Sequence, residues 1–133
     1  MVRVKGTLIS VHGKTDGSNT TGTFSLECEW FENAVAYIKL DRGIVAKLWS
    51  IEASMNPVTV IVEFTHDVTV DTPTWTEVKR IHLASEGEVA HDKRRPILVV
   101  TGRSGKEAIR FRWSQSTAAE SHITAILEFT EPE

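Results

Sequence analysis

Apolar and polar residues alternate with a period of two along most of this chain, and this alternation most constrains its fold. The clearest run follows Asn56-Pro57, where Val58, Val60, Val62 and Phe64 alternate with Thr59, Ile61, Glu63 and Thr65. Successive side chains of an extended strand point to opposite faces, so the run predicts a strand with one buried face. No segment has the 3.6-residue period that would require a helix.

The same pattern predicts eight or nine strands separated by turn signals. We expect them at residues 2–11, 24–31, 35–40, 44–53, 58–65, 75–83, 97–101, 109–114 and 123–129. A change of phase near Gly6 predicts a bulge, residues 12–23 a loop, and Asp41-Arg42-Gly43 a hairpin turn. Strands at this spacing indicate an antiparallel β-sandwich, and eight strands in two sheets match a jelly roll.

A chain of 133 residues fits one domain, which we expect to span residues 1–133. This length buries enough surface to fold without a metal or a disulfide, and the single Cys28 is expected to be a buried apolar residue. The alternation assigns ten residues to the core. They are Val58, Val60, Val62, Phe64, Ile109, Phe111, Trp113, Ile123, Leu127 and Phe129.

The start of the chain and its hydropathy bear on location. Residues 1–5 lack the apolar stretch of a signal peptide, and no apolar run approaches the 18 residues of a membrane span. We therefore expect a protein that is not secreted through a signal peptide, that stays in the cytoplasm of the cell that makes it, and that has no membrane partner.

The sequence contains no recognisable catalytic or metal-binding motif. The five histidines have no metal-ligand spacing, and no nucleophile elbow, carboxylate pair or dinucleotide fingerprint is present. These observations predict a protein that is not an enzyme and that needs no cofactor and no metal.

The four tryptophans suggest one possible ligand. Trp30 and Trp113 share the apolar face of their segments and are expected in the core, whereas Trp75 opens a strand beside a loop. Exposed flat rings on a β-sandwich stack on sugar rings. Trp75 is therefore the candidate ligand-facing aromatic residue of a carbohydrate-binding module, which is the alternative to an assembly protein.

Charge is unevenly distributed along the chain. The net charge is −3, which argues against binding nucleic acid through bulk charge. Seven basic residues nevertheless gather within residues 93–112, and Glu27 and Glu29 lie in one expected strand. These runs are either solvated faces or complementary patches on neighbouring copies; contact of the basic segment with nucleic acid is a third reading.

The overall pattern resembles a group of viral structural proteins. Its most similar part is the run Asn56-Pro57-Val58-Thr59-Val60-Ile61-Val62-Glu63-Phe64, which leads through a polar tip to Thr74-Trp75-Thr76-Glu77-Val78. In this respect the chain resembles the small single jelly-roll capsid, decoration and tail accessory proteins of phages and archaeal viruses. The resemblance implies a virion component that assembles with copies of itself and with other virion proteins, and it transfers no functional residue.

Apolar residues on the second face of several strands predict self-association. Phe31, Ile61 and Ile126 each lie opposite a residue expected in the core, so each needs cover from a loop or another chain. With Arg110, Arg112, Glu27 and Glu29 they form the candidate interface. We expect a homo-oligomer, with a trimer preferred by analogy. The alternative is a monomer whose loops cover these residues.

Overall fold

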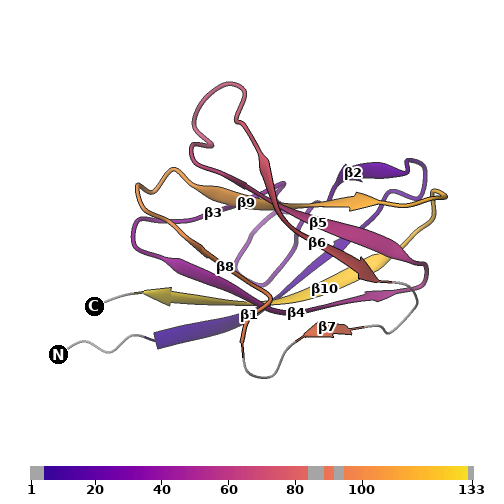
Figure 1. The fold of residues 1–133 in the computed structure, drawn as a ribbon, viewed down its shortest axis with the longest axis horizontal. Helices are drawn as coiled ribbons and strands as arrows, with labels where there is room; N and C mark the ends of the chain where they lie inside the picture. Colours follow the sequence, from indigo (N-terminus) through magenta and orange to yellow (C-terminus); the bar gives the residue numbers. More distant parts are fainter. Residues whose placement is uncertain (1–4, 84–88, 92–94, 132–133) are drawn as a thin grey trace.

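The computed structural model describes residues 5–83, 89–91 and 95–131 (Figure 1). Within these ranges it contains strands and no helix, and hence no helix that could span a membrane. The strands are β1 (Lys5–Lys14), β2 (Thr21–Thr23), β3 (Ile38–Lys39), β4 (Val45–Ser54), β5 (Val58–Thr65), β6 (Thr76–Leu83), β7 (Val89–His91), β8 (Leu98–Thr101), β9 (Ala108–Ser114) and β10 (His122–Glu131).

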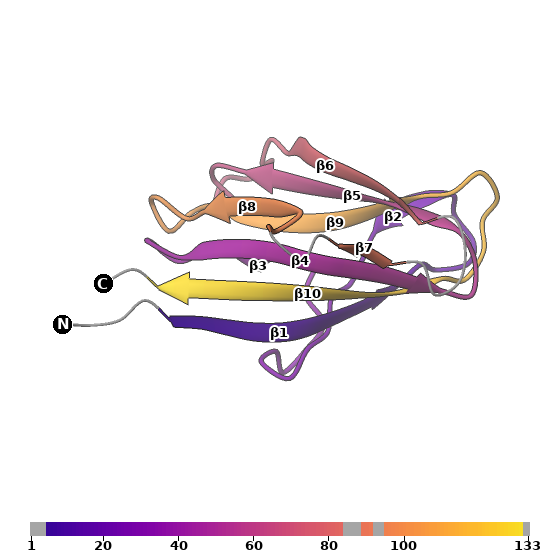
Figure 2. The same cartoon turned by 60° about the horizontal axis from the view of Figure 1, so that its bottom comes forward.

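The strands form two antiparallel sheets that pack face to face (Figures 1 and 2). Sheet A has the order β1-β10-β4, and β7 and β8 pair with successive parts of the free edge of β4. Sheet B has the order β9-β5-β6, and β2 and β3 share the other edge of β9. The ten described strands thus occupy eight positions.

This strand order is that of a jelly roll. Within the sheets β1 pairs with β10, β2 with β9, β4 with β8, and β5 with β6. The pairs are nested from the ends of the chain toward its middle, as in one long hairpin rolled up so that β10 also meets β4 and β9 also meets β5. The predicted antiparallel, jelly-roll-like β-sandwich is therefore confirmed.

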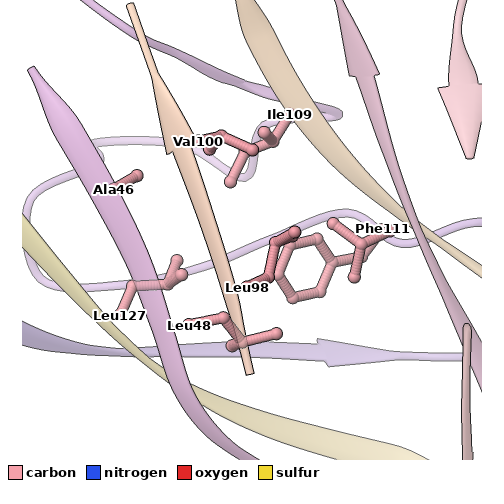
Figure 3. Close-up of a pocket in the computed structure, with 8 residues that line it drawn as sticks. Ala46, Leu48, Leu98, Val100, Ile109, Phe111 and Leu127 are labelled. Atoms are coloured by element: carbon pink, nitrogen blue, oxygen red, sulfur yellow. The ribbon is translucent and has the colours of Figure 1, made fainter. Parts of the chain in front are cut away.

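The core lies between the inner faces of the two sheets. Eight of the ten residues expected there are buried, whereas Phe64 and Phe129 are half-buried and pack against the core from its margin. Figure 3 shows Leu48 and Leu127 of sheet A facing Phe111 of sheet B, in a gap that leaves no room for a water molecule. The inter-sheet space is packed and is not a ligand cavity.

The expected strand at residues 24–31 is wrong. Its backbone forms no regular ladder. It makes isolated bridges, between Glu27 and His12 of β1 and between Leu26 and Val35, and the amide of Phe24 donates to the carbonyl of Phe111. The amide of Phe31 donates to the carbonyl of Cys28, so the chain turns there and the alternation of two is lost. Phe31 packs against the core and Trp30 is exposed, the reverse of the expectation, and Cys28 is half-buried rather than buried.

The bulges do not lie where the sequence indicated. β1 pairs with β10 without interruption from Lys5 to Lys14, so the change of phase near Gly6 marks no bulge and leaves Leu8 on the solvent face. The register shifts instead on β4, where Trp49 is the extra residue, and on β6, where Val78 is the extra residue. Alternation within one strand cannot reveal an extra residue that only the partner strand defines.

Two expected connections also differ. Asp41-Arg42-Gly43 joins β3 of sheet B to β4 of sheet A, so it crosses between the sheets and does not close a hairpin. The expected loop at 12–23 is shorter, because β1 continues to Lys14 and β2 begins at Thr21. The predicted hairpin between residues 58–65 and 75–83 is confirmed as β5 and β6.

Candidate functional site

The outer face of sheet B collects three residues of the candidate interface. Ile61 of β5 lies opposite Arg112 of β9 on one side and Arg80 of β6 on the other. Arg110 lies two residues from Arg112 on the same face. Ile61 is half-buried, and the two flanking arginines stand on either side of it.

Arg110 joins a charged and aromatic cluster at the end of this face. Its Nε donates to Glu63 Oε1 at 2.7 Å, and its Cζ lies 4.3 Å from the centroid of the Trp75 ring. Tyr37 is the second aromatic residue of the cluster, and its ring centroid lies 6.2 Å from that of Trp75. Trp75, the candidate ligand-facing aromatic, is half-buried with a guanidinium stacked over its ring.

Arg112 differs from its neighbours in lacking a partner. Among the described residues its guanidinium makes no ion pair or hydrogen bond, whereas Arg80 pairs with Glu77 at 2.7 Å and Arg110 with Glu63. The charge of Arg110 is therefore already balanced within its own chain, and Arg112 is the residue of the pair that can meet an outside carboxylate.

The other candidate interface residues lie elsewhere. Ile126 is on the outer face of sheet A, half-buried and opposite Ser10 and Ser50. Glu27 and Glu29 are exposed on the segment beside β1. The structure thus brings Ile61, Arg110 and Arg112 together and separates them from Ile126 and from the acidic segment.

The turn after Glu27 presents an aromatic side chain to solvent. Trp30 is 50% exposed, and its ring rests on that of Phe129 with centroids 5.8 Å apart. Exposed Glu29 and Glu32 flank it. We call residues 29–32 the Trp30 turn. One sequence signal could have indicated it: the adjacent aromatic residues Trp30 and Phe31 cannot lie on the same face of a strand.

A groove lies on the side of the sandwich where β6 of sheet B and β8 of sheet A are edge strands. It encloses about 460 Å³ and is lined by Phe64, His66, Val78, Val99, Val100, Thr101, Arg103 and Glu107. Val78 is 37% exposed and Val99 48% exposed. We call it the β6–β8 groove; no sequence pattern revealed it, because its walls come from both sheets.

The turn between β8 and β9 forms one end of this groove. Glu107 is buried there, and its Oε1 accepts hydrogen bonds from the amides of Ser104 and Gly105 at 3.1 and 3.2 Å. Burial alone would raise the pKa of Glu107, but the hydrogen bonds from the turn outweigh it and lower this pKa to about 2. Glu107 is therefore a structural anion, while Arg103 and Lys106 of the same turn are exposed.

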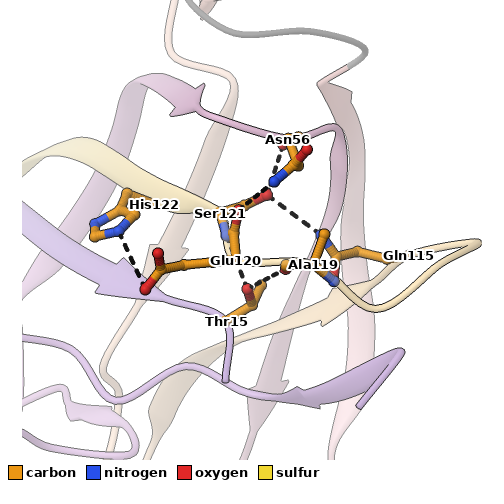
Figure 4. Close-up of polar contacts among 7 residues, drawn as sticks. All are labelled: Thr15, Asn56, Gln115, Ala119, Glu120, Ser121 and His122. Carbon is orange, nitrogen blue, oxygen red and sulfur yellow. Dashed lines mark hydrogen bonds and ion pairs between the residues drawn. The ribbon is translucent and has the colours of Figure 1, made fainter. Parts of the chain in front are cut away.

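A polar network closes the opposite end of the sandwich (Figure 4). The Thr15 hydroxyl donates to the Ala119 carbonyl at 2.7 Å and accepts from the Ser121 amide at 2.9 Å. The Ser121 hydroxyl donates to the Asn56 carbonyl at 2.6 Å and accepts from Gln115 at 3.2 Å. These bonds satisfy the hydrogen-bonding groups of the buried Thr15 and Ser121. They also link the β1–β2, β4–β5 and β9–β10 connections, which is a structural role.

In the described part of the chain no group of three or more His, Cys, Asp or Glu side chains is placed to hold a metal ion. His82 contacts the Thr59 hydroxyl at 2.7 Å, and His122 lies 3.9 Å from Glu120, both at the surface. The surfaces above are thus suited to binding, through charge, aromatic rings and apolar walls.

Comparison with known proteins adds no assignment. No protein-family model matches the chain, and no curated protein is significantly similar to it.

Proposed function

We propose that this chain is a non-catalytic structural protein that assembles with copies of itself as a capsid, decoration or tail component of a virion. The observation that carries the proposal is the β6–β8 groove, whose apolar walls include Val78 and Val99 and stay uncovered in a single copy. Uncovered apolar side chains over a groove are characteristic of a surface that binds another protein.

The distribution of charge supports assembly between identical copies. The Trp30 turn on the β1 side carries Glu29 and Glu32, whereas the β6–β8 groove has Arg103 at its edge and Lys106 on the adjoining turn. Surfaces of opposite charge on one chain favour contact between copies in a defined orientation. The jelly-roll strand order agrees with the viral resemblance, which also suggests other virion proteins as partners and a trimer as the preferred state.

Carbohydrate binding is the second candidate function, and the pairing of Trp75 with Tyr37 favours it. Both rings lie near Arg110 on the outer face of sheet B, and Tyr37 is exposed. A sugar stacks on a free ring face, however, and Arg110 occupies one face of Trp75. A sugar would therefore have to bind to the Tyr37 side or displace the guanidinium from its bond with Glu63.

Light scattering coupled to size-exclusion chromatography tests the proposal. At micromolar concentration we expect a mass that is a multiple of 14.8 kDa, three times that value for the preferred trimer, and a decrease as salt screens the charges. A mass of 14.8 kDa that does not change with concentration or salt contradicts self-assembly. Titration with oligosaccharides, followed by Trp fluorescence, then tests the carbohydrate alternative.

The virion assignment needs a separate measurement. Mass spectrometry of particles purified from cells that carry the gene should find this chain among the particle proteins. Its absence from the particles, together with its presence in the cell extract, would contradict a virion component while leaving self-assembly intact.

A further inference from the structure

We propose that the Trp30 turn of one copy docks into the β6–β8 groove of the next copy, so that the protein assembles head to tail. This inference rests on the proposed self-assembly and identifies the two surfaces that carry it. The β6–β8 groove was not part of the interface expected from the sequence, whereas the Trp30 turn contains Phe31 and Glu29 of that candidate interface.

The Trp30 turn has the properties of a preformed anchor. Phe31 packs against the core, and two backbone hydrogen bonds between Glu27 and His12 hold the preceding segment to β1. The ring of Trp30 packs on that of Phe129, so about half of the Trp30 surface is covered and the other half is exposed to solvent. A large aromatic residue that is already ordered loses little conformational entropy on binding, which is why such residues dominate the energetics of interfaces.

The β6–β8 groove has the size and lining to receive this side chain. Its volume of about 460 Å³ lies within the range of pockets that hold small organic ligands, and an indole is smaller than most of those. The exposed Val78 and Val99 stand on its two walls, with Phe64 between the sheets. Docking would remove these apolar surfaces and the free half of Trp30 from water together.

The charges around the two surfaces are complementary. Glu29 and Glu32 flank Trp30, while Arg103 lies at the groove and Lys106 is exposed on the same turn. The carboxylate of Glu107 also lines the groove, but amides of its own turn already compensate its charge. An acidic turn entering this groove therefore meets the positive charge of Arg103 and of Lys106, although Lys106 also interacts with Asp67 of its own chain.

The two surfaces lie on opposite sides of the fold. In Figure 2 sheet A extends from β1 at the bottom to β8 at the top, and the segment that contains the Trp30 turn passes below β1. One copy therefore cannot fill its own groove. Contact between two different surfaces is heterologous, and such contacts close into a ring when the rotation between copies permits it.

Two single variants and their mixture test the inference. Trp30→Ser removes the anchor, and Val99→Glu places an acidic group on the groove wall; Leu8→Ser, on the solvent face of β1, is the matched control. Circular dichroism and the melting temperature establish that each variant is folded. We expect each test variant to lower the self-association constant at least about 30-fold, as loss of a hot-spot side chain does, and the control to leave it unchanged.

The mixture distinguishes a contact between the Trp30 turn and the groove from a two-fold contact that pairs either surface with itself. The Trp30→Ser chain keeps an intact groove and the Val99→Glu chain keeps an intact anchor. An equimolar mixture should therefore form a heterodimer of twice 14.8 kDa and nothing larger. A mixture that stays monomeric overturns the inference, as do variants that remain fully assembled. A wild-type chain that is monomeric would instead overturn the proposed function itself.

Discussion

Gly22 of β2 lies directly against the indole ring of Trp113, its partner on β9. A Cβ atom added at Gly22 would overlap Cζ2 and Cη2 of that ring. Trp113 is buried, and its Nε1 donates to the Asn19 carbonyl at 3.2 Å. Its ring packs edge to face with that of Phe24, with the two ring centroids 5.1 Å apart. The ring is held on three sides and cannot move away from a new side chain.

Gly22→Ala should therefore destabilise the protein by about 1–3 kcal/mol, the usual cost of overpacking a core. The measurement is urea unfolding followed by Trp fluorescence. Thr21→Ala, at the exposed first position of the same strand, is the control and should change the free energy of unfolding by less than about 0.5 kcal/mol. An alanine at position 22 without effect would show that β2 does not pack on Trp113 as described.

Glu107→Gln should make stability less dependent on pH in the acid range. The folded-state pKa of Glu107, about 2, lies below its ordinary value of 4.5, so the ionised carboxylate stabilises the folded state at pH values above 4.5. This contribution is lost as the pH falls from 4.5 toward 2. The variant should be less stable at pH 7 by about 1–2 kcal/mol, since solvent near the turn screens the interaction.

Melting temperatures of both proteins between pH 7 and pH 2 measure this effect. The two curves should approach each other as the pH falls, whereas Thr21→Ala, which removes no titratable group, should keep a constant offset. A constant offset for Glu107→Gln as well would contradict the role assigned to the turn amides.

Met55 should be replaceable by glycine with a gain in stability. Its φ of 79° is in the left-handed region, where a side chain costs about 1–2 kcal/mol, and the side chain is about half exposed. Met55→Gly should raise the free energy of unfolding by up to about 1 kcal/mol. The relief of strain is partly offset because glycine loses more conformational entropy on folding. Met55→Ala retains the Cβ and should give no gain; equal effects of the two variants would argue against backbone strain.

Arg110 and Glu63 should show coupling in a double-mutant cycle. Both side chains are largely shielded from solvent. Their coupling free energy should therefore be about 1 kcal/mol, the upper end of the range measured for ion pairs at protein surfaces. The cycle uses Arg110→Met and Glu63→Gln, measured by chemical unfolding, and Arg110→Met should also change the fluorescence of Trp75. Arg112→Met, which removes a guanidinium without a described partner, should be nearly neutral; a large effect there would indicate a contact that a single copy does not contain.

The sandwich and much of its core could be predicted because alternation is a local property. Val58, Val60 and Val62 lie on one face of one strand, and burying that face requires only another apolar sheet. The candidate site could be predicted only in part. Arg110 and Arg112 share a face because they are two residues apart. The stacking of Arg110 on Trp75, however, joins β9 to the residue before β6, and no single segment specifies how these two elements align.

The alternation of apolar residues thus predicts most of the strands, their buried faces and the sandwich class, because side-chain direction in an extended chain follows from parity alone. The assembled fold, in contrast, set the path of residues 24–37. There the bridges of Glu27 to His12 and of Leu26 to Val35 replace regular pairing, and they turn Phe31 inward and Trp30 outward. It also decided which strand edges stay open, since the groove between β6 and β8 exists only once both sheets are assembled.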